Sequence, residues 1–499
     1  MKVLSFFAYN NSHLFQELKR PETNLAEALE LRVDRFEGGL DFARLKKHCP
    51  KTVIFTCRQG TLEENRRREL YAQALEGGVQ YIDLDFEDYS KFSDLIQERP
   101  QNLILSYHNY GGCEFPMELE DRFFSTKAGI HKIALQVNDS YEGFLCLEKI
   151  KKLSQRTSKL AFVFMGEAGE WSRTAYKGLG GYLSFFCFDG EYTAPGQVSL
   201  NQYHHEILRS SSKDSDVYGI IGDPIAHSKS PYFHNHFFSK FKISASYHRF
   251  LTRDLKNFFQ FLPEEVKGLS VTTPYKDQLA PYLCELDPSA AASGVVNTVK
   301  RTSSGLKGYN TDGAAVVEAL GRQFPEWQDC RQIVVLGAGG VARSVLSALY
   351  PFRQKVKVRN RTDEKAYALA EKFQVEFMPF KGSLDLSDTV LIQATSAGMG
   401  ENRQIPVPPM FLTPTTLIVE SIYHPRHTPL VEVGLDLGCR VMTGDVMFYY
   451  QALGQQKIWF DGRSLEIGDA IELMRLSEMT QDDLQQDEES QDFKDSYDG

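Results

Sequence analysis

Short apolar runs rich in β-forming residues recur along the first 205 residues of the chain, at intervals of 22–29 residues. The eight runs cover residues 3–8, 28–34, 52–57, 80–85, 103–108, 131–136, 160–165 and 182–187. The segments between them suit helices, most clearly residues 62–75. Strands that alternate with helices predict a parallel sheet. Eight such units predict a closed (β/α)8 barrel, with an open doubly wound sheet as the alternative.

The pattern changes in the second half of the chain. An apolar strand is predicted at Val217–Gly222, and Ser228-Lys229-Ser230-Pro231 follows it at a predicted helix start. Farther on, the buried strand Ile333–Leu336 runs into a glycine-rich turn and a helix over 343–349. A strand, a G-x-G-x-x-A turn and a helix in that order predict a Rossmann lobe. The alternative is a helix start of the same type without a nucleotide.

Charged side chains interrupt the strands of the first half where packing alone would not require them. They are Glu30, Arg32, Arg58, Asp85, His108 and Lys132. A (β/α)8 barrel carries its active site at the carboxyl ends of its strands. Lys132 precedes the apolar run Ile133-Ala134-Leu135, so burial should lower its pKa and leave a nucleophilic amine that can form a Schiff base with a ketone. The alternative is that Lys132 reaches solvent and His108 is a surface residue.

Residues 1–205 resemble type I 3-dehydroquinate dehydratase. The resemblance rests on Glu30-Leu31-Arg32-Val33-Asp34, Ser106-Tyr107-His108, Lys132-Ile133-Ala134, Met165-Gly166 with Ser172-Arg173, and Ala194-Pro195-Gly196-Gln197. It implies that Lys132 condenses with the C3 ketone of 3-dehydroquinate, that His108 moves the C2 proton, and that Arg173 binds the carboxylate. It further implies that hydroxyl binding and closure fall to Glu30, Arg32, Arg58, Thr193 and Gln197. Asp85 replaces the usual Glu beside the histidine, and Thr193 replaces a Ser, so the contact between His108 and Asp85 is an open question.

Residues 217–477 resemble shikimate dehydrogenase. The motifs are Ser228-Lys229-Ser230-Pro231, Val271-Thr272 with Pro274 and Lys276, Val296-Asn297-Thr298, Asn310-Thr311-Asp312-Gly313, the glycine-rich turn, Asn360-Arg361-Thr362, Ala394-Thr395 with Gly398-Met399, Tyr423 with Pro425 and Thr428, and 444–451. The resemblance implies that Lys276 and Asp312 are catalytic. It implies substrate binding by Ser228, Ser230, Thr272, Asn297, Thr311, Tyr423 and Gln451. Ser270, Gln393 and Glu420 depart from the family's usual residues.

The cofactor expected for the second half is NADP(H). The strand after the glycine-rich turn ends in Arg359-Asn360-Arg361-Thr362, and basic residues there suit a 2′-phosphate, whereas NAD sites usually carry an acid. The expected cofactor-binding residues are Gly337, Ala338, Gly339, Gly340, Val341, Ala342, Asn360, Arg361, Thr362 and Gly444. The two halves together imply consecutive conversion of 3-dehydroquinate to shikimate. The alternatives are an NAD-dependent quinate/shikimate dehydrogenase fused to the dehydratase, and a non-catalytic regulator that binds pathway intermediates.

Composition and charge restrict the possible partners. The 499 residues are 42% hydrophobic and carry a net charge of −10, a globular composition that argues against nucleic-acid binding. Residues 478–499 hold nine acids and one Lys, so about −2 remains for the rest of the chain. We expect this tail to be disordered. The eight cysteines show no Cys-x-x-Cys spacing, which favours free thiols in the cytoplasm over disulfides or a metal site.

The expected organisation follows from these patterns. The barrel covers 1–209 and a polar linker covers 210–216. A two-lobed α/β dehydrogenase covers 217–477, with a substrate lobe over 217–320 and 430–477 and an NADP-binding lobe over 321–429. No apolar run is long enough to cross a membrane, and the partners expected are small-molecule substrates. The oligomeric state does not follow from the sequence.

Overall fold

The computed structural model describes residues 1–58, 60–207, 215–381 and 384–477. The expected acidic tail at 478–499 and most of the expected linker lie outside these residues. By their contacts the residues form two compact units, Met1–Lys267 and Gly268–Gly499. In the described part of the chain, the helices are too short or too polar to span a bilayer.

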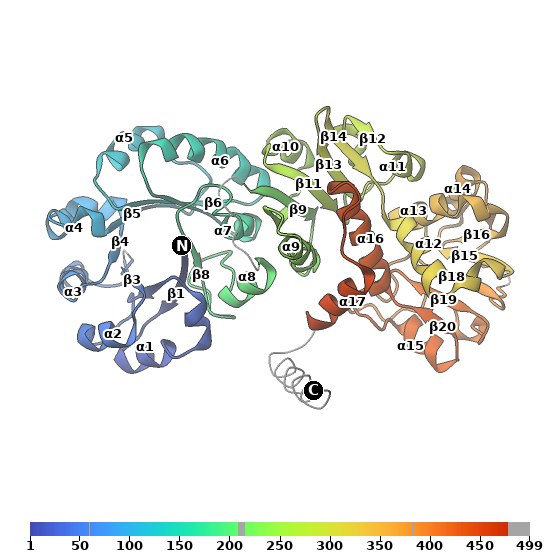
Figure 1. Ribbon diagram of the computed structural model, residues 1–499, viewed down its shortest axis with the longest axis horizontal. Coiled ribbons are helices and arrows are strands. Elements are labelled where there is room, and N and C mark those ends of the chain that lie inside the picture. The colour runs from blue at the N-terminus through green and yellow to red at the C-terminus, as the bar shows by residue number, and fades with distance from the viewer. Residues whose placement is uncertain (59, 208–214, 382–383, 478–499) are drawn as a thin grey trace, which may run out of the picture. The chain divides into compact units, whose positions relative to one another are not determined.

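The first unit contains the predicted barrel (Figure 1). Eight parallel strands pair in the order β7-β6-β5-β4-β3-β2-β1-β8. Each lies within or overlaps one of the predicted runs: β1 (Lys2–Phe7), β2 (Ala28–Arg32), β3 (Thr52–Thr56), β4 (Tyr81–Asp85), β5 (Leu103–Asn109), β6 (Ile130–Gln136), β7 (Leu160–Met165) and β8 (Ser184–Phe186). At the remaining seam, where β7 meets β8, the Tyr182 N–H donates to the Leu160 carbonyl at 2.8 Å. The fold is therefore the (β/α)8 type and not the open sheet.

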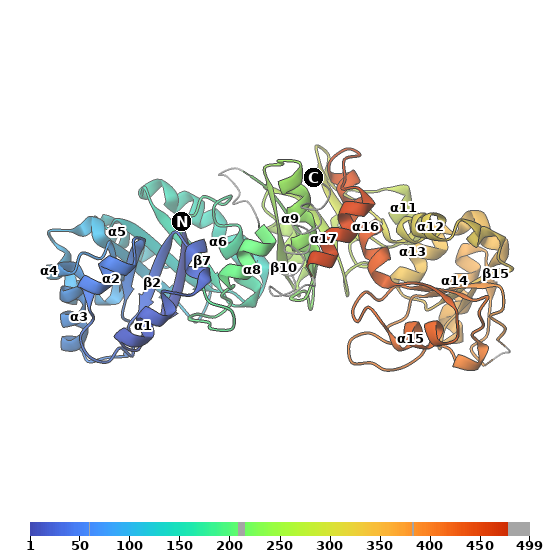
Figure 2. The ribbon, with the colours of Figure 1, turned by 60° about the horizontal axis from the view of Figure 1, so that its bottom comes forward.

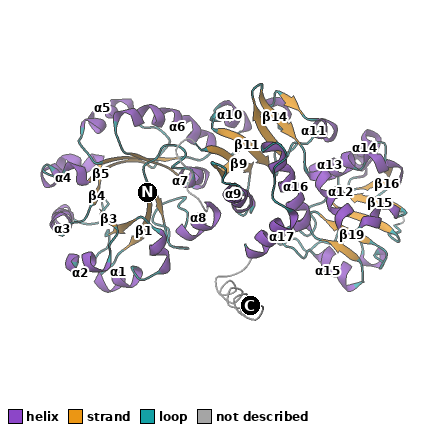
Figure 3. Ribbon diagram, viewed as in Figure 1, coloured by secondary structure: helices purple, strands orange, loops and turns teal. Residues whose placement is uncertain are grey.

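Helices surround these strands, as the purple ribbons of Figure 3 show. They are α1 (Asn11–Glu17), α2 (Phe42–His48), α3 (Glu64–Glu76), α4 (Tyr89–Ile96), α5 (Met117–Ser125), α6 (Ser140–Leu153), α7 (Glu170–Thr174) and α8 (Leu200–Ile207). Inside the barrel, Val3, Ile54, Ile104 and Val163 belong to one buried apolar cluster. Burying each such side chain contributes about 1.5–3 kcal/mol. This rigid core fixes the strand ends that carry the charged residues.

The first unit continues beyond the barrel. Strand β9 (Asp216–Gly222) pairs in parallel with β10 (Ala245–Leu251), and α9 (Ser230–Lys240) and α10 (Leu255–Gln260) accompany them. An aromatic cluster joins this part to the barrel. Phe144 of α6 lies 5.4 Å from Phe250 and 5.2 Å from Phe258 between ring centroids, and Trp171 of α7 lies 5.8 Å from Phe250. Edge-to-face aromatic contacts of this kind add to the stabilisation from area burial.

The second unit contains two groups of strands. Strand β11 (Val266–Val271) pairs antiparallel with β13 (Thr298–Thr302), which pairs with β14 (Gly305–Tyr309), and β14 pairs with β12 (Glu285–Leu286). A second, fully parallel sheet has the order β17-β16-β15-β18-β19-β20. Its strands are β15 (Gln332–Leu336), β16 (Val356–Arg359), β17 (Glu376–Phe377), β18 (Thr389–Gln393), β19 (Leu417–Glu420) and β20 (Arg440–Met442). This is the predicted Rossmann topology, in which strand order reverses beside β15.

Helices flank the sheets of the second unit. They are α11 (Pro288–Ser293), α12 (Asp312–Gln323), α13 (Gly340–Ala348), α14 (Asp363–Phe373), α15 (Pro429–Asp436), α16 (Gly444–Trp459) and α17 (Ile467–Leu476). Val335, Val345 and Ile392 share one buried core with Trp327. Gly313 allows α12 to approach α13, because a Cβ there would lie 2.1 Å from the Ser344 carbonyl oxygen. This close packing sets the first residue of α12 beside the start of α13.

Candidate active sites

A cavity of about 210 Å³ opens at the carboxyl ends of the barrel strands. Its wall contains all eight residues expected from the first half of the sequence: Glu30, Arg32, Arg58, His108, Lys132, Arg173, Thr193 and Gln197. Tyr110, which the sequence analysis did not single out, also lines it. The barrel therefore brings together residues that lie up to 167 positions apart. Strand-end placement predicts this for Glu30, Arg32, Arg58, His108 and Lys132, and the resemblance implies it for the other three.

Lys132 lies deep in this cavity. Only 3% of the residue is exposed, and its Nζ donates to Asp83 Oδ2 at 2.6 Å. The same nitrogen lies 4.4 Å from the centre of the Phe185 ring. Burial lowers the pKa of Lys132, while the Asp83 carboxylate opposes that shift. The amine is held in one place with an acceptor for its proton in direct contact.

Asp83 is the hub of the polar network and was missed from the sequence. It accepts from Lys132, from Ser106 Oγ and from Arg58 Nη1, the last at 3.0 Å. Burial alone would raise the pKa of Asp83, but Arg58 and Lys132 outweigh it and hold the pKa well below its usual range. The available signal was the alternation of Asp83 with Asp85 along β4, since both side chains then share one face.

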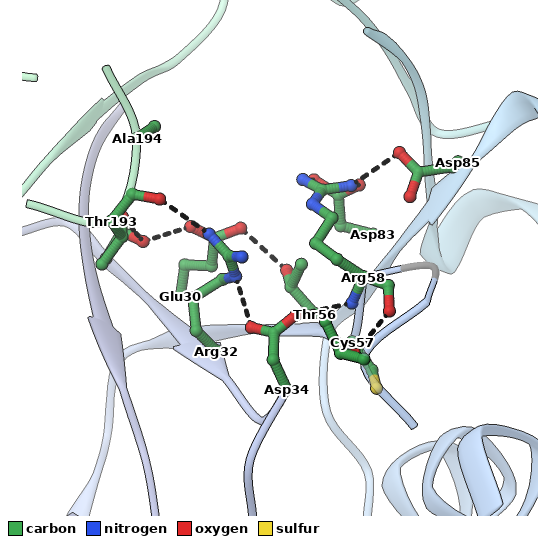
Figure 4. Close-up of polar contacts among 12 residues, drawn as sticks. Glu30, Arg32, Asp34, Thr56, Cys57, Arg58, Asp83, Asp85, Thr193 and Ala194 are labelled. Atoms are coloured by element: carbon green, nitrogen blue, oxygen red, sulfur yellow. Dashed lines mark hydrogen bonds and ion pairs between the residues drawn. The ribbon is translucent and has the colours of Figure 1, made fainter. Parts of the chain in front are cut away.

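His108 contacts the carboxylate that the sequence left in question. Its Nδ1 lies 2.9 Å from Asp85 Oδ1, and the same oxygen accepts from Arg58 Nη1 at 2.9 Å (Figure 4 shows Arg58 with both aspartates). The shorter Asp side chain therefore still reaches the ring. Burial and the charge of Arg58 lower the pKa of His108 to about 4, against the smaller opposing effect of Asp85. The imidazole is neutral at pH 7 and can accept a proton.

Arg173 is a buried cation held by carbonyl groups. Its guanidinium donates to the carbonyls of Gly196 at 2.9 Å, Pro195 at 3.0 Å and Phe185 at 3.4 Å. Within the described ranges no carboxylate forms an ion pair with it. Burial lowers the pKa of Arg173 to about 10. A buried positive charge without a counter-ion is costly, so this part of the cavity favours an anionic ligand.

The segment after β8 contacts strands β1 and β2 beside the cavity. Thr193 Oγ1 lies 2.8 Å from Ser5 Oγ, which also bonds Glu30, and Arg32 Nη1 donates to the Thr193 carbonyl at 3.1 Å (Figure 4). Gln197 Oε1 accepts from the Thr193 N–H at 2.8 Å. Its Nε2 is buried and has no hydrogen-bond partner among the described residues. An unsatisfied buried amide in a cavity wall is suited to a ligand oxygen.

Lys276 and Asp312 meet in the second unit. Lys276 Nζ donates to Asp312 Oδ2 at 2.7 Å, with side-chain exposures of 22% and 2%. Asn297 Nδ2 donates to the other Asp312 oxygen at 2.7 Å and to Thr311 Oγ1 at 2.8 Å. Thr311 Oγ1 in turn donates to the Gln451 carbonyl at 3.0 Å. The carboxylate is thus fixed from one side, and the ammonium remains accessible on the other.

Four other residues of the second half are expected to bind substrate, namely Ser228, Ser230, Thr272 and Tyr423. Thr272 is half-buried directly after β11, and Tyr423, 40% exposed, packs against Phe448. Ser228 and Ser230 lie in the first unit at the start of α9, where Ser228 Oγ accepts from the Ser230 N–H at 3.3 Å.

The glycine-rich turn leads from β15 into α13. Gly337 has φ +114°, and a Cβ there would lie 2.5 Å from the Ala394 carbonyl oxygen. The fold therefore requires glycine at this position whether or not a nucleotide binds. A Cβ on Gly339 would meet nothing within 4 Å. Gly339 therefore leaves open space at the helix start, which fits a pyrophosphate against the N–H groups of α13. Ala338, Gly340, Val341 and Ala342 continue this turn and the first turn of α13.

Arg359, which ends β16, and the residues that follow it have different surroundings. Arg359 is buried and donates to the carbonyls of Pro379, at 2.7 Å, and Phe380. Arg361 is exposed, and Asn360 Nδ2 donates to the Thr362 carbonyl at 3.0 Å. Of the two arginines in the basic stretch, only Arg361 presents its charge to solvent. Gly444 begins α16, where a Cβ would lie 2.0 Å from the Ile422 carbonyl, so backbone packing requires glycine at this position.

Comparisons with known proteins agree with both halves. The family model for type I 3-dehydroquinase matches residues 6–215. The model for the shikimate dehydrogenase substrate binding domain matches residues 220–299, and the model for shikimate / quinate 5-dehydrogenase matches residues 318–399.

Similar proteins include both fused and separate forms. The shikimate dehydrogenase (NADP(+)) of Desulfitobacterium hafniense is 34% identical over 50% of this chain and 93% of its own length. A crystal structure of a shikimate dehydrogenase in complex with NADP+ is 28% identical, covers 53% of this chain and 96% of its own, and has a TM-score of 0.49. The bifunctional 3-dehydroquinate dehydratase/shikimate dehydrogenase of Arabidopsis thaliana, named chloroplastic, is 31% identical over 87% of this chain and 77% of its own length. The chain therefore belongs to the family of bifunctional 3-dehydroquinate dehydratase/shikimate dehydrogenases.

Proposed function

We propose that the first half of the chain dehydrates 3-dehydroquinate to 3-dehydroshikimate, and that the second half reduces this product with NADPH to shikimate. The observation that carries the proposal is the cavity in which a buried lysine, a neutral histidine and an arginine without a carboxylate partner among the described residues face one ligand space. The lysine suits a ketone, the histidine can accept a proton, and the arginine suits a carboxylate.

In the first reaction, the neutral Lys132 amine attacks the C3 ketone and water is lost, while Asp83 Oδ2, 2.6 Å from Nζ, keeps the nitrogen in position. The resulting cationic imine acidifies the C2 proton. His108 removes it and then protonates the departing C1 hydroxyl, while Asp85 orients the imidazole through Nδ1. Water then hydrolyses the imine, which releases 3-dehydroshikimate and the free Lys132 amine. Arg173 binds the substrate carboxylate. The hydroxyls are held by Glu30, Arg32, Arg58, Thr193 and Gln197.

When bound, NADPH would supply the hydride that reduces the C3 ketone of 3-dehydroshikimate in the second reaction. Lys276 stabilises the alkoxide that forms and supplies its proton, with Asp312 holding the ammonium in position. Substrate binding falls to Ser228, Ser230, Thr272, Asn297, Thr311, Tyr423 and Gln451. The residues proposed to hold the cofactor are Gly337, Ala338, Gly339, Gly340, Val341, Ala342, Asn360, Arg361, Thr362 and Gly444.

The proposed organisation assigns residues 1–209 to the dehydratase and 217–477 to the dehydrogenase, joined by 210–216. The substrate lobe would cover 217–320 and 430–477, and the NADP-binding lobe 321–429. All eight cysteines are free. Free thiols are typical of a reducing compartment, and we propose the cytoplasm.

Purified protein given 3-dehydroquinate and NADPH should form shikimate, with NADPH favoured over NADH. Changing Arg361 to Ala should raise the KM for NADPH by about tenfold and leave the KM for NADH unchanged, because a charge-assisted contact to the 2′-phosphate is lost. The absorbance of the reduced nicotinamide measures the rates from which both KM values are obtained.

The matched control is Arg353→Ala, another arginine at the surface of this lobe, which should change neither KM. A wild-type preference for NADH would contradict the NADP assignment. Binding of 3-dehydroquinate without turnover at either site would indicate a regulator instead.

The dehydration rate should depend on pH through His108. Because its pKa is lowered to about 4, kcat/KM should stay level from neutral pH downward and fall only as the pH drops through about 4 and the imidazole gains its proton. Asp85 raises this pKa, so Asp85→Asn should move the fall to lower pH. A fall centred near the ordinary histidine pKa would contradict the assignment of His108 as a buried base.

A further inference from the structure

Helix α7 of the barrel presents side chains in two directions. Arg173 lines the dehydratase cavity. On the same five-residue helix, Thr174 Oγ1 lies 2.8 Å from His248 Nδ1, and Glu170 Oε1 lies 3.4 Å from Arg249 Nη1. His248 and Arg249 are adjacent on β10, which follows the barrel in the chain and packs against α7. Helix α7 of the dehydratase half is therefore in contact with β10, and β10 pairs with β9, the first strand of the dehydrogenase half.

Arg249 is buried and is held mainly by the barrel. Its Nη1 and Nη2 each lie 2.7 Å from an oxygen of Glu206, which lies on α8. This is a two-pronged pair between a guanidinium and a carboxylate, the strongest geometry for such ions. Arg249 has a side-chain exposure of 8% and Glu206 of 13%, so water screens the pair little.

The same guanidinium reaches the segment before α9. Arg249 Nη2 donates to the Ser228 carbonyl at 2.8 Å. Ser228 Oγ accepts from the Ser230 N–H, so the peptide that Arg249 holds belongs to the segment that presents both serines. Helix α8, which carries Glu206, packs against α9, which begins at Ser230, and Figure 2 shows the two helices as neighbours.

We propose that Arg249 is a positioning residue for the substrate-binding serines of the dehydrogenase, and that Glu206 of the dehydratase half holds Arg249 in place. The inference rests on the proposed function, since it takes Ser228 and Ser230 as ligands of the shikimate carboxylate. Arg249 touches neither substrate nor cofactor. It acts by fixing the Ser228 carbonyl, and thereby the direction in which the two serines point.

The effect expected from this arrangement is on substrate binding. Without Glu206, the Arg249 guanidinium loses its bidentate partner and the Ser228 segment loses an oriented donor. The serines would then contact the carboxylate less well in both ground and transition states, which raises KM and leaves kcat unchanged. NADP+ binding and dehydration use other residues and should not change.

The decisive variant is Glu206→Gln, a substitution in the dehydratase half assayed in the dehydrogenase reaction. It keeps the size of the side chain and removes its charge. The KM for shikimate should rise by about tenfold, while kcat, the KM for NADP+ and the dehydration rate stay within about twofold. Arg249→Met should raise the same KM at least as far, and Arg249→Lys should recover part of the loss.

The control is Lys151→Met. Lys151 Nζ bonds Glu265 Oε1 at 2.8 Å, so it also joins the barrel to residues beyond 216, but it does not contact the Ser228 segment. It should leave every kinetic constant unchanged. If Arg249→Met does not fold, Glu206→Gln decides the question, because it leaves the Arg249 side chain in place.

An unchanged KM for shikimate in Glu206→Gln would overturn the inference while the proposed function stands. A fall in kcat of both reactions, or an equal rise of KM in Lys151→Met, would also overturn it, because either result indicates a general structural role. A wild-type protein that does not oxidise shikimate with NADP+ would overturn the proposed function itself, and this inference with it.

Discussion

Replacing Lys132 with Ala should lower the kcat of dehydration by at least about 10⁴-fold, because Lys132 is the only lysine among the described residues that line the cavity. Lys132 is buried, its Nζ contacts Asp83 and the Phe185 ring, and burial lowers its pKa. The dehydrogenase reaction of the same variant should be unchanged, since its catalytic lysine lies in the other unit. Steady-state rates of both reactions measure this separation.

Borohydride tests the covalent step directly. Reduction in the presence of 3-dehydroquinate should inactivate the dehydratase irreversibly and add substrate mass to the peptide that contains Lys132. The control is Lys159→Ala, in which the lysine lost packs over the Tyr182 ring at the start of β7 and should not affect labelling. Absence of an adduct, or an adduct on another lysine, would contradict the imine mechanism.

Lys276→Ala should reduce dehydrogenase turnover by about 10³-fold or more, because the developing alkoxide loses both its cation and its proton donor. The Lys276 Nζ is held 2.7 Å from Asp312, whose carboxylate is fixed by Asn297. Asp312→Asn should also lower kcat, since it removes the charge that orients the ammonium. Dehydration should be unaffected in both variants.

The matched control is Lys300→Ala. Lys300 is another lysine of the second unit with an aspartate partner, Asp461, at 2.8 Å, and it should leave turnover unchanged. If dehydration and reduction fall together in Lys276→Ala, the two reactions do not depend on separate residues, and the assignment of one site to each half is wrong.

The sequence predicted most of the barrel because strand spacing and strand-end charge are local signals. Every predicted run contains most of an observed strand, although β8 has only Ser184–Phe186 of the six residues expected. The strand ends of a closed barrel meet at one face, so Glu30, Arg32, Arg58, His108 and Lys132 could be expected in one cavity before any contact was known. Arg173, Thr193 and Gln197 do not lie on strands, and only the family resemblance placed them there.

Side-chain contacts could not be predicted in the same way. Alternation along β4 places Asp83 on the same face as Asp85, but its partners Lys132 and Arg58 come from other segments that only the closed barrel brings beside it. Arg359 ends β16 and begins the expected basic stretch, but its guanidinium donates to carbonyls of a loop about twenty residues later. The Arg249 and Glu206 pair joins residues 43 positions apart, and no motif marks either one.

The aromatic cluster of Phe144, Trp171, Phe250 and Phe258 bears on how such a gene could be divided. A relative such as the Desulfitobacterium enzyme matches only half of this chain, so the dehydrogenase also occurs as a separate polypeptide. Cutting this gene between the two halves would produce two fragments, each with a newly exposed aromatic face. Exposed patches of that kind promote aggregation. Fission of the gene would therefore require polar substitutions on β10 and α6 before either product was soluble on its own.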